Sequence, residues 1–319
     1  MLRGDGIGAI GELLVEFVCG DKGGHHLRAG IYSGPYASGA PGIFIDQAAL
    51  CGARCIFAGA VGDDAFGTVI LDRLKADGVD TSLIAVAPGV PTGSAFVSYN
   101  DDGSRDFVYN IVHSAASQFS VDDAMIEGLA AFGTGIMHVS GSVLASADMC
   151  AKVLHVCKEL HRRGARISFD PNIRKELIGD ASYFSAVNEL MGMCSFFLPS
   201  DDDAATLFPG ESLDSFSAKL FAKGVNYVVL KRGDKGSSGV SRDGEAFSYE
   251  AHKVEVVDPT GAGDCFCATF IALISSGDYS FDKALQYANA AGALAVTKVG
   301  PMEGNSGLRQ IETFLALQS

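Results

Sequence analysis

The sequence lacks several features that would place it in large classes of protein. It contains no apolar run long enough to cross a bilayer as a helix. None of its eight cysteines belongs to a Cys-x-x-Cys pair, and several lie in apolar runs, where a free thiol behaves as a small hydrophobic group. The patterns G-x-x-x-x-G-K-[ST] and G-x-S-x-G are both missing. Their absence excludes a Walker-type phosphate loop and leaves a hydrolase without its nucleophile elbow.

The chain also has few positive charges. It carries 24 Lys and Arg residues against 38 Asp and Glu residues, a formal net charge of −14, which argues against nucleic acid or an anionic membrane as a partner. Because no signal peptide begins at Met1, we expect a cytoplasmic protein whose cysteines stay reduced. At 319 residues, 48% of them hydrophobic, the chain can bury the core of an α/β enzyme.

Glycine is abundant, and its first cluster is misleading. Residues 6–11 match the dinucleotide-binding pattern G-x-G-x-x-G. In that pattern the glycines join a strand to a helix. Here they precede or interrupt the first predicted strand, residues 10–17, in which Glu12 and Glu16 are embedded. The context therefore disfavours an NAD-dependent oxidoreductase.

Most of the chain alternates predicted strands with predicted helices. The early elements are helix 39–49, strand 54–61 and a hairpin formed by strands 92–99 and 106–111. The later strands are 135–140, 166–170, 195–199 and 226–231, and the later helices are 146–163, 180–192 and 213–223. A second hairpin, 238–250, comes before the C-terminal helices 262–276 and 281–297. This alternation predicts a parallel sheet with helices on both faces, and the first hairpin, with residues 18–37, predicts a small β lid.

The turn at residues 257–264, Val-Asp-Pro-Thr-Gly-Ala-Gly-Asp, is the most informative stretch. It lies between a strand-like run, 251–257, and the predicted helix that begins at residue 262. Its glycines permit a tight turn where unpaired N–H groups and the positive end of the helix dipole favour an anion such as phosphate. A carboxylate at Asp264 would repel that anion. Its presence is explained if it has a chemical role, such as accepting a proton from a hydroxyl that attacks the phosphate. Spacing alone leaves open a plain glycine turn with an ordinary acidic first-turn residue.

The same turn, followed by Cys265-Phe266, resembles the C-terminal signature of the ribokinase-like (PfkB) carbohydrate kinases. The resemblance runs through nearly the whole chain. It implies one kinase domain over residues 1–319, with a three-layer, doubly wound, mostly parallel α/β sheet and a β-sheet lid from insertions at about 12–37 and 92–112. It also implies transfer of the γ-phosphoryl group of ATP to a primary hydroxyl of a small sugar, with Mg²⁺ as cofactor, and it permits a homodimer through the lid.

The resemblance assigns catalytic roles to the turn. It implies that Asp264 is the base for the sugar hydroxyl. It implies that the anion hole is formed by Gly261, Ala262 and Gly263. A catalytically silent sugar or nucleotide sensor on the same fold is the alternative, and the intact acid argues against it.

A second segment, Asp170-Pro-Asn-Ile-Arg174, follows a predicted strand and resembles an Asp-x-Asn-x-Arg segment of the family. The resemblance implies that Arg174 neutralises phosphate oxygens and that Asn172 holds phosphate or substrate. Taken alone, the spacing favours an Asx-Pro turn with a surface arginine, and the resemblance reverses that preference.

The resemblance also implies nucleotide and cation sites. The nucleotide-side residues are Lys231, Gly233, Gly236 and Asn289. The family's Asn-x-x-Glu motif aligns with Ser200 and Asp203, so both positions have changed while the acid is retained, and Asp203 is expected to influence magnesium indirectly. Without the resemblance, the three acids at 201–203 indicate a solvated helix start. Oxygen ligands from Asp258, Thr260 and the loop near Gly300 would hold a monovalent cation such as K⁺.

The substrate-binding residues implied by the resemblance are Glu16, Gly39, Arg105 and Asn172. Two departures bear on the sugar. Ser38-Gly39-Ala40-Pro41 is a weakened form of the family's Gly-Gly motif, and Ile43 replaces a common sugar-binding Asn. Ile111 stands where 2-keto-3-deoxygluconate kinases carry an arginine for the substrate carboxylate. We therefore predict a neutral ketohexose, tagatose or fructose. A 2-keto-3-deoxygluconate kinase is the alternative if Arg105 folds inward.

Overall fold

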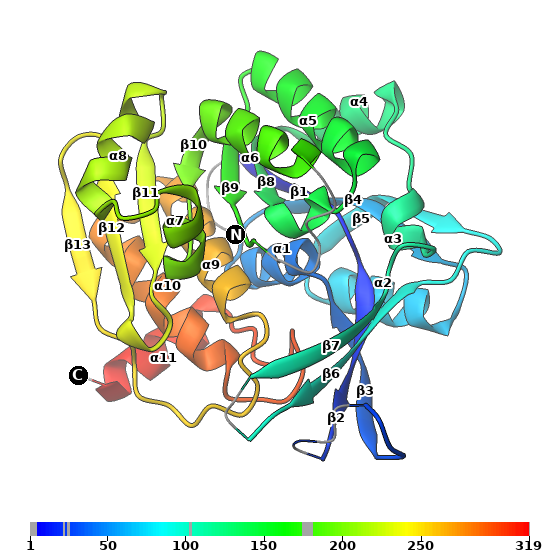
Figure 1. The fold of residues 1–319 in the computed structure, drawn as a ribbon. Coiled ribbons are helices and arrows are strands. Elements are labelled where there is room, and N and C mark those ends of the chain that lie inside the picture. The colour runs from blue at the N-terminus through cyan, green and yellow to red at the C-terminus, as the bar shows by residue number, and fades with distance from the viewer. Residues whose placement is uncertain (1–4, 22, 24–25, 102–103, 174–180, 319) are drawn as a thin grey trace.

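The computed structural model of the chain describes residues 5–21, 23, 26–101, 104–173 and 181–318. A large sheet runs through the described part in the order β13-β12-β11-β10-β9-β8-β1-β4-β5 (Figure 1). Its strands are β1 (Gly6–Ile10), β4 (Cys55–Gly62), β5 (Val79–Ala87), β8 (Thr134–Ser140), β9 (Arg166–Asp170), β10 (Cys194–Phe197), β11 (Tyr227–Lys231), β12 (Ser237–Ser241) and β13 (Ala246–Tyr249). Neighbours from β11 to β5 are parallel, and β12 and β13 add an antiparallel edge.

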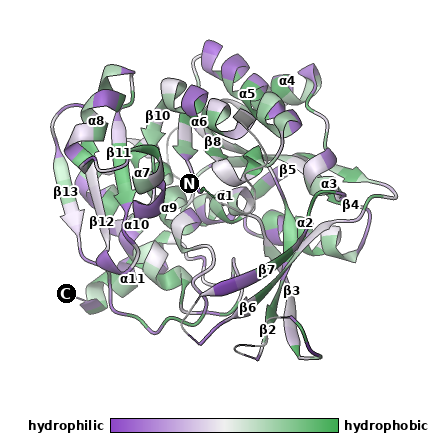
Figure 2. Ribbon diagram, viewed as in Figure 1, coloured by the Kyte–Doolittle hydropathy of each residue, from purple (hydrophilic) through white to green (hydrophobic). Residues whose placement is uncertain are grey.

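Helices cover both faces of this sheet, because its central strands are apolar on both sides. Adjacent residues of one strand enter different cores: Phe196 packs with the α1, α9 and α10 side, whereas Phe197 packs with the α4, α5, α6 and α8 side. The helices are α1 (Ala40–Leu50), α2 (Ala65–Ala76), α3 (Ala115–Gln118), α4 (Asp123–Phe132), α5 (Ala147–Arg162), α6 (Ala181–Met193), α7 (Asp201–Leu207), α8 (Leu213–Ala222), α9 (Ala262–Ser276), α10 (Phe281–Ala295) and α11 (Leu308–Gln318). In Figure 2 the central strands are largely hydrophobic, while α5 and α8 mix hydrophobic and hydrophilic residues. The predicted doubly wound, three-layer α/β fold is confirmed.

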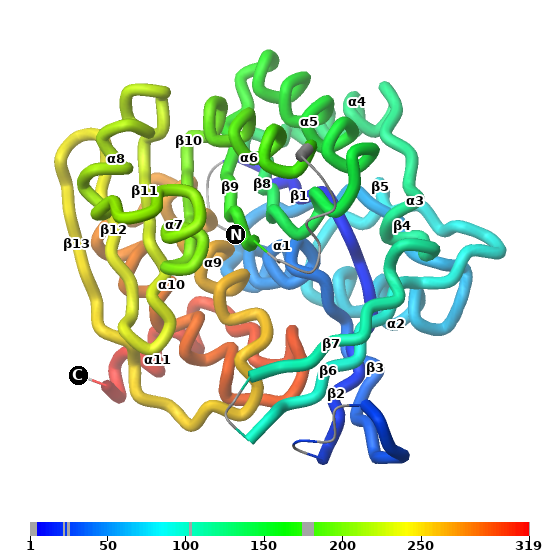
Figure 3. Tube along the Cα trace, viewed as in Figure 1, coloured from blue at the N-terminus to red at the C-terminus, as the bar shows by residue number. Residues whose placement is uncertain are grey.

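A smaller sheet, β3-β2-β6-β7, projects from the main body (Figure 3). It pairs strands from two distant parts of the chain: β2 (Leu14–Cys19) and β3 (Tyr32–Ser38) with β6 (Gly93–Tyr99) and β7 (Arg105–Asn110). One side of this small sheet faces the carboxyl ends of the large sheet's strands, where ligands bind in open α/β folds.

The prediction of one continuous strand over 10–17 is wrong. The chain ends β1 at Ile10, breaks at residues 11–13, and starts β2 in the other sheet at Leu14. Gly11, with φ of 149°, lies so close to Pro41 that an added Cβ would be 2.8 Å from its ring. The break therefore depends on glycine, and it is what carries the chain from the large sheet to the small one.

The prediction of a strand-like run at 251–257 is also wrong, because these residues form no regular element. The large sheet ends at β13, and Val256 is 62% exposed as the chain crosses toward α9. Several elements were not predicted: β5, an edge strand with mixed burial, and the helices α3, α4 and α11. The polar positions within β5 hide the period-two pattern that marks a strand.

Candidate active site

The turn before α9 has the geometry that its glycines predict. Gly261 is the N-cap of α9 with φ of 83°, and a Cβ added there would lie 2.6 Å from the carbonyl oxygen of Pro301. No side chain among the described residues caps this helix start, so the first amides of α9 are directed toward the space in front of it. Asp264, in the first turn, is 7% exposed and lines a pocket there. The turn can therefore hold an anion beside a carboxylate.

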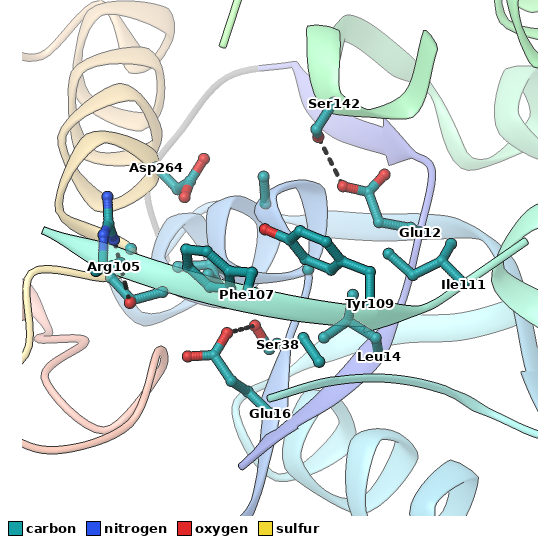
Figure 4. A pocket seen from close by; sticks show the side chains of 16 residues that line it. Glu12, Leu14, Glu16, Ser38, Arg105, Phe107, Tyr109, Ile111, Ser142 and Asp264 are labelled. Carbon is teal, nitrogen blue, oxygen red and sulfur yellow. Dashed lines mark hydrogen bonds between the residues drawn. The ribbon is translucent and has the colours of Figure 1, made fainter. Parts of the chain in front are cut away.

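The pocket opens between the small sheet and the start of α9 and contains about 560 Å³ of space, including its mouth. Figure 4 shows Asp264 and Arg105 at one side, Glu12, Ser142 and Ile111 at the other, and Tyr109 between them. The lining residues come from the break after β1, from β2, β3, α1, β6 and β7, from the short helix Gly141–Leu144 after β8, and from the turn and first residues of α9. Such a concave, polar site between sheet and lid-like hairpin suits a small, hydroxyl-rich ligand.

One face of the hairpin strand β7 supplies alternate residues to the pocket, as strand geometry requires. These residues are Arg105, Phe107, Tyr109 and, just after the strand, Ile111. Arg105 folds inward: its Nη1 donates to Thr260 Oγ1 at 3.4 Å, and its guanidinium lies 5.6 Å from the centre of the Phe107 ring. This inward position is the condition under which the acid-sugar alternative stays open.

Two buried glutamates line the pocket. Glu16, on β2, accepts a hydrogen bond from Ser38 Oγ at 3.3 Å, and Glu12, in the break before β2, accepts one from Ser142 Oγ at 2.6 Å. Gly39 lies against this break, because a Cβ there would be 2.4 Å from the Glu12 carbonyl oxygen. Sequence reasoning included Glu16 in the site but missed Glu12. The available signal was an acid next to a glycine in an otherwise apolar run.

Asp258 holds the turn in place through hydrogen bonds to both of its carboxylate oxygens. Its Oδ1 accepts from the Tyr99 hydroxyl and from the Thr260 amide at 2.9 Å, and its Oδ2 accepts from the Gly300 amide at 3.0 Å. Burial and the neighbouring carboxylate raise the pKa of Tyr99, so its phenol stays protonated and donates. The turn, the loop at Gly300 and the end of β6 are therefore tied to one buried carboxylate.

The segment after β9 lies next to the pocket rather than in its lining. Asn172 has φ of 36°, and its Nδ2 donates to Ser140 Oγ at 3.1 Å. Asp203 accepts from the Ile173 amide and the Ser200 amide, both at 2.8 Å, and from Ser200 Oγ at 2.7 Å. Asp203 therefore holds this segment against α7. Arg174 lies outside the described residues.

The predicted nucleotide-side residues fall into two groups. Lys231 points inward: its Nζ donates to Asp170 and to Cys267 Sγ at 3.3 Å, and a Cβ on Gly263 would lie 3.7 Å from it. Burial by itself would lower the pKa of Lys231, but the Asp170 carboxylate outweighs burial and raises that pKa. The positive charge therefore lies directly under the turn that begins α9.

The second group, Gly233, Gly236 and Asn289, surrounds the β12–β13 hairpin. Gly236 has φ of 89°, and a Cβ there would be 1.9 Å from the Tyr249 carbonyl oxygen. Asn289 Nδ2 donates to the Glu250 carbonyl oxygen at 2.7 Å. These contacts fix the edge of the large sheet beside α10.

Comparisons with known proteins identify the family of the chain. The model of the pfkB family of carbohydrate kinases matches residues 37–306, and the chain belongs to this family. It is 31% identical to a 2-dehydro-3-deoxygluconokinase of Bacillus subtilis over 97% of this chain and 94% of the relative, and 29% identical to fructokinase-2 of Zea mays over 92% and 88%. It is therefore a carbohydrate kinase.

Solved structures show the same fold. A candidate ribokinase II from E. coli is 41% identical, with a TM-score of 0.92 over 98% of this chain and 99% of that one. A fructokinase from Vibrio cholerae is 22% identical, with a TM-score of 0.83 over 99% and 100%. In the described part of this chain, no helix combines the length and apolarity that a membrane span requires.

Proposed function

We propose that this kinase transfers the γ-phosphoryl group of ATP to a primary hydroxyl of a neutral ketohexose, tagatose or fructose. The observation that carries the proposal is the lining of the pocket, which contains the buried carboxylates of Glu12 and Glu16 and the apolar Ile111. Carboxylates accept hydrogen bonds from sugar hydroxyls. They would repel an acid sugar, whose carboxylate would lose its hydration without a compensating cation at Ile111.

The proposed chemistry relies on position and charge. Asp264 accepts the proton of the hydroxyl as that hydroxyl attacks the γ-phosphorus, and the bond from this phosphorus to the β–γ bridging oxygen breaks to release ADP. The amides of Gly261, Ala262 and Gly263 donate to the oxygens of the transferred group. Lys231, whose Nζ lies next to Gly263, adds a positive charge to the same place. Arg174 is proposed to neutralise phosphate oxygens from the segment after β9.

Nucleotide binding is proposed for the side of α9 that faces β11 and the Gly233–Gly236 loop. A structure of the 41% identical E. coli protein was determined in complex with ATP and Mg²⁺, which supports the same ligands here. Magnesium would neutralise the phosphate charges when bound. Asp203 is already engaged by three protein donors, which fits an ion held mainly by the nucleotide phosphates and water, with Asp203 acting indirectly.

A 2-keto-3-deoxygluconate kinase is the second candidate, and two observations favour it. Arg105 lines the pocket, so a cation is available to a substrate carboxylate. Relatives at 31% and 32% identity carry the name 2-dehydro-3-deoxygluconokinase. Against this assignment, Arg105 lies at the Thr260 side and already contacts Thr260 and Phe107.

The test is a comparison of kcat/KM for tagatose, fructose and 2-keto-3-deoxygluconate under one set of conditions. A neutral ketohexose should be preferred by roughly tenfold or more, because the acid sugar lacks a full charge partner. A tenfold preference for the acid sugar would overturn the proposal. Arg105→Met would then be the next variant to measure, with loss of the acid-sugar activity expected.

A further inference from the structure

A row of hydrogen-bonded side chains links the sugar pocket to the segment after β9. Ser142 Oγ donates to Glu12 Oε1 at 2.6 Å, Ser140 and Ser142 hydroxyls are 3.0 Å apart, and Asn172 Nδ2 reaches Ser140 Oγ at 3.1 Å. We call these four residues the Glu12–Asn172 chain. Its first two members line the pocket (Figure 4), whereas Ser140 is fully buried behind them.

The direction of every hydrogen bond in this chain follows from its Glu12 end. An ionised carboxylate can only accept, so the single hydroxyl proton of Ser142 goes to Glu12. Ser142 must then accept from Ser140, and Ser140 must accept from the amide nitrogen of Asn172. A change in the position or charge of the Glu12 carboxylate therefore alters the bonding of each member, as expected for a buried polar network.

Two further contacts hold the Ser142 end and the Asn172 end of this network close together. Ser140 and Asp170 are partners at the carboxyl ends of β8 and β9, and a Cβ on Gly141 would lie 1.7 Å from the Pro171 carbonyl oxygen. Asn172 has a left-handed φ of 36°, which a residue with a Cβ keeps only when its surroundings hold it. The Asn172 side chain supplies part of that hold through Ser140.

We propose that Glu12 binds sugar hydroxyls and that the Glu12–Asn172 chain couples sugar binding to the arrangement of the segment after β9. This inference rests on the proposed function of the pocket as the sugar site. Because residues 170–173 belong to the proposed phosphate-side segment, a sugar that fixes Glu12 also favours the Asn172 conformation in which the nucleotide phosphates are received. By linkage, the nucleotide tightens sugar binding by the same factor.

The experiment measures the dissociation constant of the sugar by calorimetry, with and without a non-hydrolysable ATP analogue and Mg²⁺. The sugar used is whichever of tagatose, fructose and 2-keto-3-deoxygluconate the wild-type enzyme turns over with the highest kcat/KM. We expect the analogue to tighten binding to the wild-type enzyme by about fivefold or more. Equal constants with and without the analogue would overturn the coupling.

Ser140→Ala removes the middle of the chain without changing the pocket lining. The analogue should then tighten sugar binding by less than about twofold, while the variant still binds sugar. Ser168→Ala is the matched control, since Ser168 is also fully buried, on the neighbouring strand β9, and its hydroxyl pairs with His138 Nδ1 at 2.9 Å outside the chain. The control should keep the wild-type coupling. Retained coupling in Ser140→Ala would overturn the proposal. If Ser140→Ala does not fold, Ser142→Ala is measured in its place.

Glu12→Gln tests the carboxylate itself, since glutamine can still accept from Ser142. A neutral sugar should bind roughly tenfold more weakly, because hydrogen bonds to a charged acceptor are the stronger ones. An unchanged constant would overturn the role of Glu12. If the acid sugar is the best wild-type substrate, the proposed ketohexose function fails on that result alone. The coupling remains decided by Ser140→Ala against Ser168→Ala.

Discussion

The two ends of the pocket are built in different ways. At the end formed by Thr260, Gly261 and Asp264, which we call the transfer end, the lining comes from one local turn and the first turn of the buried helix α9. At the opposite end, which we call the sugar end, side chains such as Glu12, Ser142 and Ile111 converge from distant parts of the chain. On the proposed function, the reaction takes place at the transfer end, where a local turn positions Asp264, and the choice of sugar depends on the side chains of the sugar end.

The largest expected effect is at the transfer end. Asp264→Asn keeps the shape of the side chain but removes its ability to take a proton, so kcat should fall by about a thousandfold or more. Binding of ATP and of the sugar, measured separately by calorimetry, should stay within about threefold of wild type. A variant with kcat within tenfold of wild type would show that Asp264 is not the base.

At the sugar end, a charge should alter specificity and leave the reaction intact. Ile111→Arg places a cation beside Glu12 and Tyr109, and we expect the ratio of kcat/KM for 2-keto-3-deoxygluconate over tagatose to rise by roughly tenfold or more. Ile111→Met is the control, since it changes shape without adding charge. A rise of equal size in the control would attribute the change to space rather than to charge.

The sequence predicted the transfer end well, because all of its parts are local. The turn at 257–264, the start of α9 and the inward position of Asp264 depend on consecutive residues whose turn and helix chemistry is readable. The strands from β8 to β11 were predicted for a similar reason, since buried parallel strands are short apolar runs. Lys231 was singled out, but its position next to Gly263 depends on the packing of α9 on the sheet.

The sugar end could not be predicted in the same way. Glu12 enters the pocket because the chain breaks at residues 11–13, and its partner Ser142 is 130 positions away in the sequence. The inward position of Arg105 depends on the register of β7 against β6, in which Arg105 pairs with Tyr99. A change of register by one residue would turn that side chain to the other face of the sheet.

A third prediction compares the two glycines of the transfer end. Gly261→Ala should lower the free energy of unfolding by about 2 kcal/mol or more, because φ of 83° disfavours a Cβ that would also meet the Pro301 oxygen. Gly263→Ala should stay within about 1 kcal/mol of wild type, since that residue is helical and its Cβ would find ordinary contact distances to Lys231. Urea denaturation of both variants gives the comparison. Equal losses would mean that the conformation of Gly261 is not what the turn requires.

The smallest expected effect concerns a monovalent cation at the transfer end. Both Asp258 oxygens accept hydrogen bonds, from Tyr99, Thr260 and Gly300, so a bound cation would rely mainly on carbonyl oxygens of the turn and of the loop at Gly300. Its influence on Asp264 would be indirect, through the position of the turn. We therefore expect K⁺ to raise kcat only severalfold over tetramethylammonium at matched ionic strength, with the KM for the sugar unchanged. Tyr99→Phe, which removes one donor to Asp258, should make the enzyme more dependent on K⁺. Equal rates in the two salts, for both the wild-type enzyme and the variant, would exclude a cation from this turn.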